Sequence, residues 1–195
     1  MKSKQRVAEH GEVFTAEREV KAMCDLVADE CTRIESKFLE PACGEGNFLI
    51  EILKRKLQTV KSNFQKNFSE CERNSLIALS SLYGIDILED NVKICRENLF
   101  NLWDEFYSAI APSSSDSVRD SARFILEKNI ICGDSINGTD KIIFSEWIFL
   151  DDKINVQRSD FNFRNMLEDS MYANIPLKDF DPIDYRRLRD SESNL

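Results

Sequence analysis

The chain has 195 residues, 42% of them hydrophobic and 10% aromatic, which suits one globular domain with a sizeable core. Its formal net charge of -9 and isoelectric point near 4.8 argue against a free-standing nucleic-acid binder, because phosphate contacts need clustered Lys and Arg. A single histidine, no Cys-x-x-Cys pair, no secretory leader and no apolar run near the roughly 20 residues that cross a bilayer argue against a metal site, a secreted scaffold and a membrane protein, so we expect a soluble cytoplasmic protein with reduced cysteines.

The first half of the chain is expected to alternate helices and strands. Apolar residues recur at helical spacing from residue 16 to residue 27, and Thr15 is the expected N-cap of that helix. The next expected elements are a strand over 37–41, a helix over 47–57, a polar stretch over 58–73, a short helix over 74–81, a strand over 82–87 and a helix over 89–107.

The second half begins with a segment of linker composition, residues 111–117, which we interpret as a surface loop. Further on, the pattern predicts a helix over 118–127, a strand over 129–134, a β-hairpin formed by 142–150 and 153–158, a helix over 162–171 and a charged, irregular tail over 176–195. The β-α-β-α-β order predicts an α/β fold, with a mainly parallel sheet flanked by helices. We expect one domain over 1–140, on which a C-terminal hairpin, helix and tail (141–195) pack.

The segment from Phe38 to Leu49 reads Phe-Leu-Glu-Pro-Ala-Cys-Gly-Glu-Gly-Asn-Phe-Leu: a strand ending in an acid, a glycine turn and a helix start. Glycines let the backbone turn sharply and approach a ligand, and the helix N-terminus offers free N–H donors. Acids also follow the other strands, as Asp86 and Asp134, and carboxyl ends of parallel strands meet in one crevice. Leu49 replaces the third glycine of a dinucleotide site, and a purely structural turn remains an alternative.

These segments resemble the class I S-adenosylmethionine-dependent DNA adenine methyltransferases. The first motif of that family, Asp/Glu-Pro-Ala-Cys-Gly-x-Gly-Asn-Phe-Leu, is matched at every position by residues 40–49. Residues 10–15 are similar to its amino-terminal element, with Ala16 in place of the usual proline, and residues 83–87 and 131–135 are similar to two further elements. The resemblance covers about residues 10–136, with the four elements in the family's order.

The resemblance implies a Rossmann-like fold that binds S-adenosyl-L-methionine. It would place Phe14 and Thr15 along the methionine end, Asp86 on the ribose hydroxyls, and Asp134 with Ser135 against the adenine. Three alternatives stay open: Asp86 as a helix cap, Asp134 as a turn residue and Phe14 as a core residue. The cofactor residues that the resemblance implies are Phe14, Thr15, Glu40, Ala42, Cys43, Gly44, Gly46, Asn47, Phe48, Asp86, Ile87, Asp134 and Ser135.

The family completes its active site with an Asn/Asp/Ser-Pro-Pro-aromatic element, whose ring stacks on the flipped base. The sequence contains no Pro-Pro pair, so the catalytic residues stay unassigned. The nearest approach, residues 181–185, is expected to be a solvated turn, Trp103 and Trp147 to be core residues, and the basic run 185–189 to be a solvated face or local ion pairs. The four prolines, each followed by another residue type, are Pro41, Pro112, Pro176 and Pro182.

The sequence therefore predicts a cofactor-binding, DNA adenine methyltransferase-like protein of a restriction-modification or phage system, acting on adenine N6 if active. The alternative is a non-catalytic cofactor-binding or scaffold subunit, paired with a second subunit that carries the catalytic and target-recognition elements. DNA would then be contacted through that partner, or weakly by this chain alone. A third hypothesis keeps methyl transfer but directs it to a protein or small molecule, which the acidic charge permits more readily than DNA.

Overall fold

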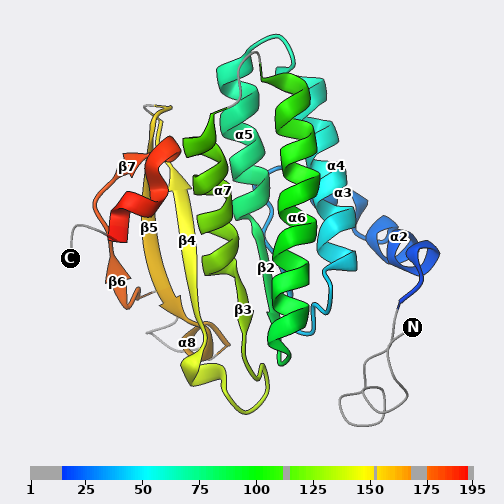
Figure 1. Cartoon of the computed structure of the whole chain (residues 1–195). Helices are drawn as coiled ribbons and strands as arrows, with labels where there is room; N and C mark the ends of the chain where they lie inside the picture. Colours follow the sequence, from blue (N-terminus) through cyan, green and yellow to red (C-terminus); the bar gives the residue numbers. More distant parts are fainter. Residues whose placement is uncertain (1–14, 112–114, 152, 168–174, 193–195) are drawn as a thin grey trace.

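The computed structural model describes residues 15–111, 115–151, 153–167 and 175–192 (Figure 1). Its centre is a parallel sheet in the order β1-β2-β3. The register pairs Phe38 with Leu82 and Gly84 with Ile130, so the carboxyl ends of the strands lie at the same edge. The three strands are β1 (Phe38–Glu40), β2 (Leu82–Asp86) and β3 (Ile130–Cys132).

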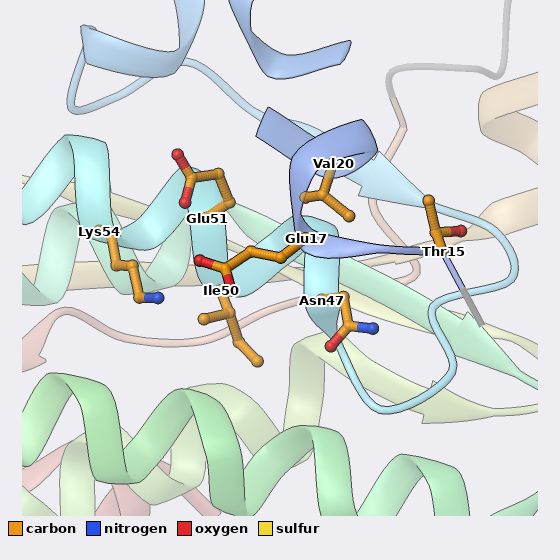
Figure 2. A pocket seen from close by; sticks show the side chains of 7 residues that line it. All are labelled: Thr15, Glu17, Val20, Asn47, Ile50, Glu51 and Lys54. Carbon is orange, nitrogen blue, oxygen red and sulfur yellow. The ribbon is translucent and has the colours of Figure 1, made fainter. Parts of the chain in front are cut away.

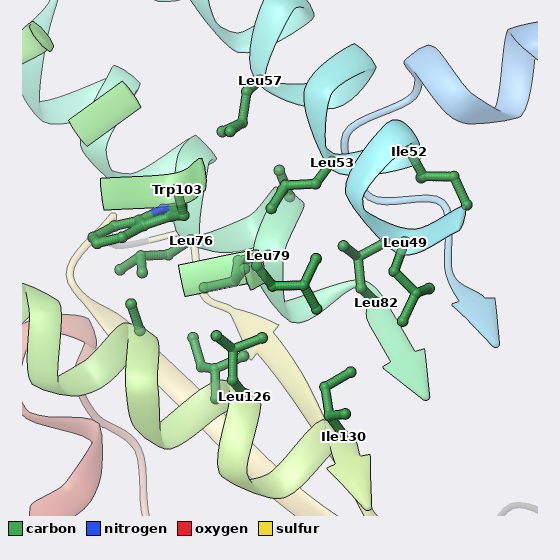
Figure 3. Packing of buried hydrophobic residues seen from close by; sticks show 14 of the residues in the cluster. Leu49, Ile52, Leu53, Leu57, Leu76, Leu79, Leu82, Trp103, Leu126 and Ile130 are labelled. Carbon is green, nitrogen blue, oxygen red and sulfur yellow. The ribbon is translucent and has the colours of Figure 1, made fainter. Parts of the chain in front are cut away.

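Two helices form each connection between neighbouring strands. Their apolar faces interlock over the sheet, where Leu53, Leu82 and Trp103 are fully buried (Figure 3). This packing follows from apolar side chains recurring every three or four residues on each helix. The connecting helices are α4 (Asn47–Phe64) and α5 (Phe68–Ser80) between β1 and β2, and α6 (Glu89–Ile110) and α7 (Asp116–Asn129) between β2 and β3.

A second, antiparallel sheet follows β3. Its hairpin pairs Ile143 with Asn162 and Phe149 with Val156, and the ring of Phe144 meets that of Tyr83 edge-on at 5.3 Å, so this sheet packs on the parallel one. The short helices α2 (Glu17–Asp25) and α3 (Ala28–Thr32) precede β1. The C-terminal elements are η1 (Thr139–Lys141), β4 (Ile143–Phe149), β5 (Asn155–Asn162), α8 (Phe163–Leu167), β6 (Lys178–Asp179), β7 (Ile183–Asp184) and η2 (Tyr185–Glu192).

The structure confirms a mixed α/β architecture, with a small parallel sheet, covering helices and an antiparallel C-terminal hairpin. We expected the helices to leave a polar stretch over 58–73 between them. Those helix bounds were wrong, because α4 continues to Phe64 and α5 begins at Phe68. Polar side chains there lie on the outer face of helices whose inner face buries Val60 and Cys71. In the described ranges, no helix is both long and apolar enough to cross a membrane.

Two further expectations at the chain ends are corrected. The helix expected over 16–27 is present as α2 but ends at Asp25, and a second short helix, α3, follows from Ala28. The tail from residue 176 is not irregular where the structure describes it, because β6 and β7 pair with β5, and η2 packs on α7. Main-chain bonds of these short strands, which carry little sequence signal, order the tail.

Candidate functional site

The turn between β1 and α4 needs glycine at two positions, for different reasons. Gly44 and Gly46 have φ angles of +53° and +92°, in the left-handed region that favours glycine. A Cβ on Gly46 would lie 2.7 Å from the Sγ of Cys95, so this glycine lets the turn pack against α6. A Cβ on Gly44 would meet nothing within 4 Å, so the backbone there is open to an approaching ligand.

Asp86, at the end of β2, holds this turn in place. Its Oδ2 accepts a hydrogen bond from the N–H of Gly44 at 2.9 Å. Its Oδ1 accepts from the N–H of Leu88 at 2.9 Å and from Nδ2 of Asn91 at 3.1 Å. A carboxylate offers about four acceptor positions, so these three donors leave Asp86 capacity for a further one. Asp86 is not the helix cap of the alternative interpretation, because the N-cap of α6 is Leu88 and no side-chain cap bond forms there.

Main-chain bonds bring the ends of all three parallel strands together. The N–H of Cys43 donates to the carbonyl of Ile85 at 2.8 Å, and the N–H of Gly133 donates to the carbonyl of Asp86 at 2.9 Å. The expected convergence of the strand ends is therefore present, with Asp86 between the other two segments. The arrangement places main-chain groups and the Asp86 carboxylate together beside the N-terminus of α4.

Asp134, after β3, makes its hydrogen bonds within its own turn. Its carboxylate accepts from the N–H groups of Ile136 at 2.8 Å and Asn137 at 2.9 Å, and from Nδ2 of Asn137 at 3.2 Å. The N–H groups of Asn137 and Ile136 hold the pKa of the Asp134 carboxyl below its usual range. This matches the turn-residue alternative, and the contact of Asp134 and Ser135 with adenine stays a prediction.

The remaining residues of the motif lie around β1 and the start of α4. Glu40 is half-buried, and it lines a cavity of about 190 Å³ together with Phe48. Burial raises the pKa of the Glu40 carboxyl above its usual value. Cys43 is buried, and a hydrogen bond with Cys95, followed by burial, raises the pKa of its thiol. Ala42 and Ile87 are exposed.

A second cavity, of about 320 Å³, lies between the start of α2 and α4 (Figure 2). It brings together two predicted cofactor residues, Thr15 and Asn47. Thr15 does not cap α2, because the N-cap is Ala16 and no side-chain cap bond forms there; Phe14 lies outside the described residues. Sequence reasoning missed the other lining residues, although those on α4 share one helical face; they are Glu17, Val20, Ile50, Glu51 and Lys54.

The aromatic residues considered for base stacking belong to the core. Trp103 is fully buried, and its Nε1 donates to Oγ of Ser75 at 3.1 Å. Trp147 is buried, and its Nε1 donates to Oδ1 of Asn129 at 3.1 Å. Tyr185, from the nearest approach to a Pro-Pro-aromatic element, is also buried. The expectation of core packing is confirmed for both tryptophans, and the solvated turn expected over 181–185 was wrong at Tyr185.

The basic run near the C-terminus is neutralised within the chain. Arg186 pairs with Asp184 at 2.5 Å and Arg187 with Asp190 at 2.7 Å. Arg189 bridges α7 to the tail, with its guanidinium 3.0 Å from Asp120 and 2.8 Å from Glu127. The local ion-pair interpretation is confirmed, and this run offers no surplus of positive charge to a phosphate backbone.

The fold and the glycine turn define an α/β domain, a class in which ligands generally bind beyond the carboxyl ends of the parallel strands. The family model described as the MmeI DNA-methyltransferase domain matches residues 16–147, about two thirds of the chain. The chain therefore belongs to this family of DNA-methyltransferase domains. The match ends within β4, and the domain boundary expected at residue 140 stays a prediction. No curated protein and no solved structure gives a match.

Proposed function

We propose that this chain binds S-adenosyl-L-methionine at the carboxyl ends of β1, β2 and β3, as the cofactor-binding domain of an adenine-N6 DNA methyltransferase of restriction-modification type. The observation that carries this proposal is the turn at Gly44, which is open to a ligand and bonded directly to Asp86. A Rossmann-like class I methyltransferase fold is part of the proposal, and the parallel order β1-β2-β3 supports it.

The residues at the turn fit this cofactor chemically. The remaining acceptor capacity of Asp86 suits a ribose hydroxyl, and the first N–H groups of α4 suit a carboxylate. The carboxylates of Glu40 and Asp86 produce a negative potential that favours the positively charged sulfonium. When bound, S-adenosyl-L-methionine supplies an electrophilic methyl group. In this proposal Thr15 and Asn47 contact its methionine end, since they line one cavity at the start of α4.

Within this proposal the chain binds the methyl donor, and a second subunit supplies the base-holding element and most of the DNA contacts. Two observations favour this division. No Pro-Pro-aromatic segment occurs in the sequence, and the arginines of the tail are already paired with carboxylates. The net charge of -9 also makes a partner the better source of phosphate contacts.

Isothermal titration calorimetry with S-adenosyl-L-methionine tests the cofactor assignment. We expect saturable binding in the micromolar range, corresponding to about -8 kcal/mol, and a rise in melting temperature on ligand addition. S-adenosylhomocysteine, which lacks the positive charge, serves as the matched ligand. Absence of both heat and thermal stabilisation at millimolar cofactor would contradict the proposal.

Methyl transfer is tested separately, by incorporation of a labelled methyl group into mixed-sequence DNA. We expect no incorporation by the purified chain alone, and incorporation after addition of a subunit that carries a Pro-Pro-aromatic element. Incorporation into a protein or small molecule instead of DNA would favour the third hypothesis from the sequence. Robust DNA methylation by the chain alone would show that catalysis needs no second subunit.

A further inference from the structure

Within the part of the chain that the structure describes, the outer edge of β1 carries no further strand of the parallel sheet. Among the strands that the structure describes, β1 pairs only with β2. The N–H of Phe38 donates to the carbonyl of Ser81 at 2.9 Å, so Phe38 points its main-chain groups at β2. Because these groups alternate along a strand, those of Leu39 point away from β2. Parallel strands are normally buried on both sides, and an open edge accepts a further strand.

Apolar side chains flank this edge on two sides. A cavity of about 310 Å³ lies between β1 and the C-terminal hairpin, and the cavity of about 190 Å³ lies between β1 and helices α2 to α4. Phe38 and Leu39 line both cavities, and the Leu39 side chain is 42% exposed. We call β1 together with these two cavities the edge groove. Its other apolar lining residues include Tyr83, Phe144, Phe161 and Met166 on the hairpin side, and Met23, Val27 and Phe48 on the helix side.

We propose that the edge groove binds an extended apolar segment of a basic partner protein, which adds to β1 as a further strand of the parallel sheet. An added main chain supplies both an acceptor for the N–H of Leu39 and a donor for its carbonyl along this edge. Since apolar side chains flank β1 on both sides, the added strand carries apolar residues on both of its faces, like an interior strand of an α/β sheet.

The net charge of the chain favours a different, basic protein over a second copy of the chain as the occupant of the edge groove. Two copies each carrying a net charge of -9 repel one another, whereas a basic protein is attracted. Locally, the groove is bounded by Glu40 and by Glu146, and the latter is already paired with Lys37. We therefore expect Lys or Arg residues beside the apolar core of the bound segment.

This inference rests on the sheet edge and not on cofactor binding, so the two can fail separately. It also gives the second subunit of the proposed function a defined place to dock. A strand added beside β1 would end next to Glu40 and the glycine turn. The partner would thereby bring its own residues to the cofactor edge of the sheet.

Binding of a synthetic peptide tests the proposal directly on the full chain. The probe has a core of alternating valine and isoleucine, flanked by lysines, and its control is the same peptide N-methylated on the core amides. We expect saturable binding of the probe, at least about tenfold weaker binding of the N-methylated control, and slower hydrogen exchange at the Leu39 amide. Because this comparison uses the wild-type chain, it does not depend on how any variant folds.

A pair of variants locates the binding surface. Leu39→Lys places a charge in the groove, whereas Ile148→Lys changes an exposed apolar residue of β4 that lines neither cavity. We expect Leu39→Lys to weaken the probe at least about tenfold and Ile148→Lys to change it by less than about twofold. Equal effects of the two variants, equal binding of the N-methylated peptide, or no binding of the probe would overturn the proposal. So would a wild-type dimer that Leu39→Lys converts to a monomer, since the occupant would then be a second copy.

Discussion

The carboxyl and amino ends of the parallel sheet both bury charged side chains, but their surroundings differ. At the carboxyl end, Asp86 is 9% exposed and bonds the N–H of Gly44, above which a Cβ would meet open space. At the amino end Lys56 is fully buried, and Glu72 on α5 is also buried, but both bond groups of the core. A buried charge therefore does not mark a ligand site by itself, and open backbone beside it is the more telling feature.

The bonds at the amino end are purely structural. Nζ of Lys56 donates to the carbonyl of Ile34 at 3.1 Å and to Oγ of Ser81 at 2.6 Å, and also bonds the carbonyl of Ser36. These bonds tie α4 to the segments that enter β1 and β2. They stabilise the amino end of the sheet, whereas the backbone at Gly44, at the carboxyl end, is open to a ligand.

Glu72 has the same structural character and should give the largest effect of all. It accepts from the hydroxyls of Tyr107 at 2.8 Å and Tyr185 at 2.7 Å, and so fixes the C-terminal tail to α5 and α6. Glu72→Ala leaves two buried hydroxyls without their charged acceptor, and we expect a loss of about 3–5 kcal/mol in the free energy of unfolding. Urea denaturation measures this loss.

Glu72→Gln is the matched control, because it keeps the shape and an acceptor oxygen, and we expect it to cost less than Glu72→Ala. Cofactor affinity of the folded protein should be unchanged in both variants. A variant that unfolds normally but loses cofactor would contradict the distinction between the two ends of the sheet.

The two glycines of the turn sharpen the comparison within the carboxyl end. Gly46→Ala combines a left-handed backbone with a contact of 2.7 Å to a buried sulfur, so we expect about 2–4 kcal/mol of destabilisation. Gly44→Ala meets no atom within 4 Å and carries only the backbone cost, about 1–2 kcal/mol. Thermal and chemical unfolding of both variants checks the order, and a more destabilised Gly44→Ala would contradict it.

Much of the architecture was predictable because its signals are local. Apolar runs followed by an acid or a glycine turn predicted β1, β2 and β3, and alternation on both sides of a short turn predicted the hairpin β4–β5. Helix lengths were less predictable, since α4 ends at Phe64 and Asn67 already caps α5 by accepting from the N–H of Glu70 at 3.3 Å. The short strands β6 and β7 depend on pairing with β5, which no local pattern encodes.

The candidate site likewise has features that local sequence motifs predict and features that depend on tertiary packing. Gly44 and Gly46 belong to one contiguous motif and Asp86 ends the next strand, so the convergence of parallel strand ends predicted that the three would lie together. The cavity that joins Thr15 to α4 depends on how α2 packs, and the bonds of Asp134 depend on a turn two residues further along. Both features depend on how segments pack or turn in space, which a pattern of residues along the sequence does not show.

Buried Lys56 predicts a dependence of stability on pH that the carboxyl end should not share. Burial lowers the pKa of Lys56 from its ordinary value of 10.5 to about 7. Above pH 7 the unfolded chain therefore holds a proton that the folded chain has released, so stability rises with pH. We expect a slope of up to about 1.4 kcal/mol per pH unit from about pH 7 to 8.5.

Denaturation at several pH values in this window, with Lys56→Met as the comparison, isolates the effect. The variant should lack the positive slope while keeping every other titrating group. Above this window the buried thiols, whose pKa values burial raises, add an opposing slope, as for Cys24. Identical slopes for wild type and variant would show that Lys56 keeps its charge when buried.

Asp86→Asn gives the smallest change in free energy but addresses function most directly. The amide keeps the size of the side chain and replaces one acceptor oxygen by a donor, which faces either Gly44 or the ligand. We expect at least about tenfold weaker binding of S-adenosyl-L-methionine, or about 1.4 kcal/mol.

A ribose contact predicts an equal loss of affinity for S-adenosylhomocysteine, whereas a contact with the sulfonium charge predicts a smaller loss for this ligand, which lacks that charge. Asp120→Asn, which alters a surface pair with Arg189, is the control and should bind both ligands as wild type does. Unchanged affinity in Asp86→Asn would place the cofactor away from β2, and so remove the functional difference between the two ends of the sheet.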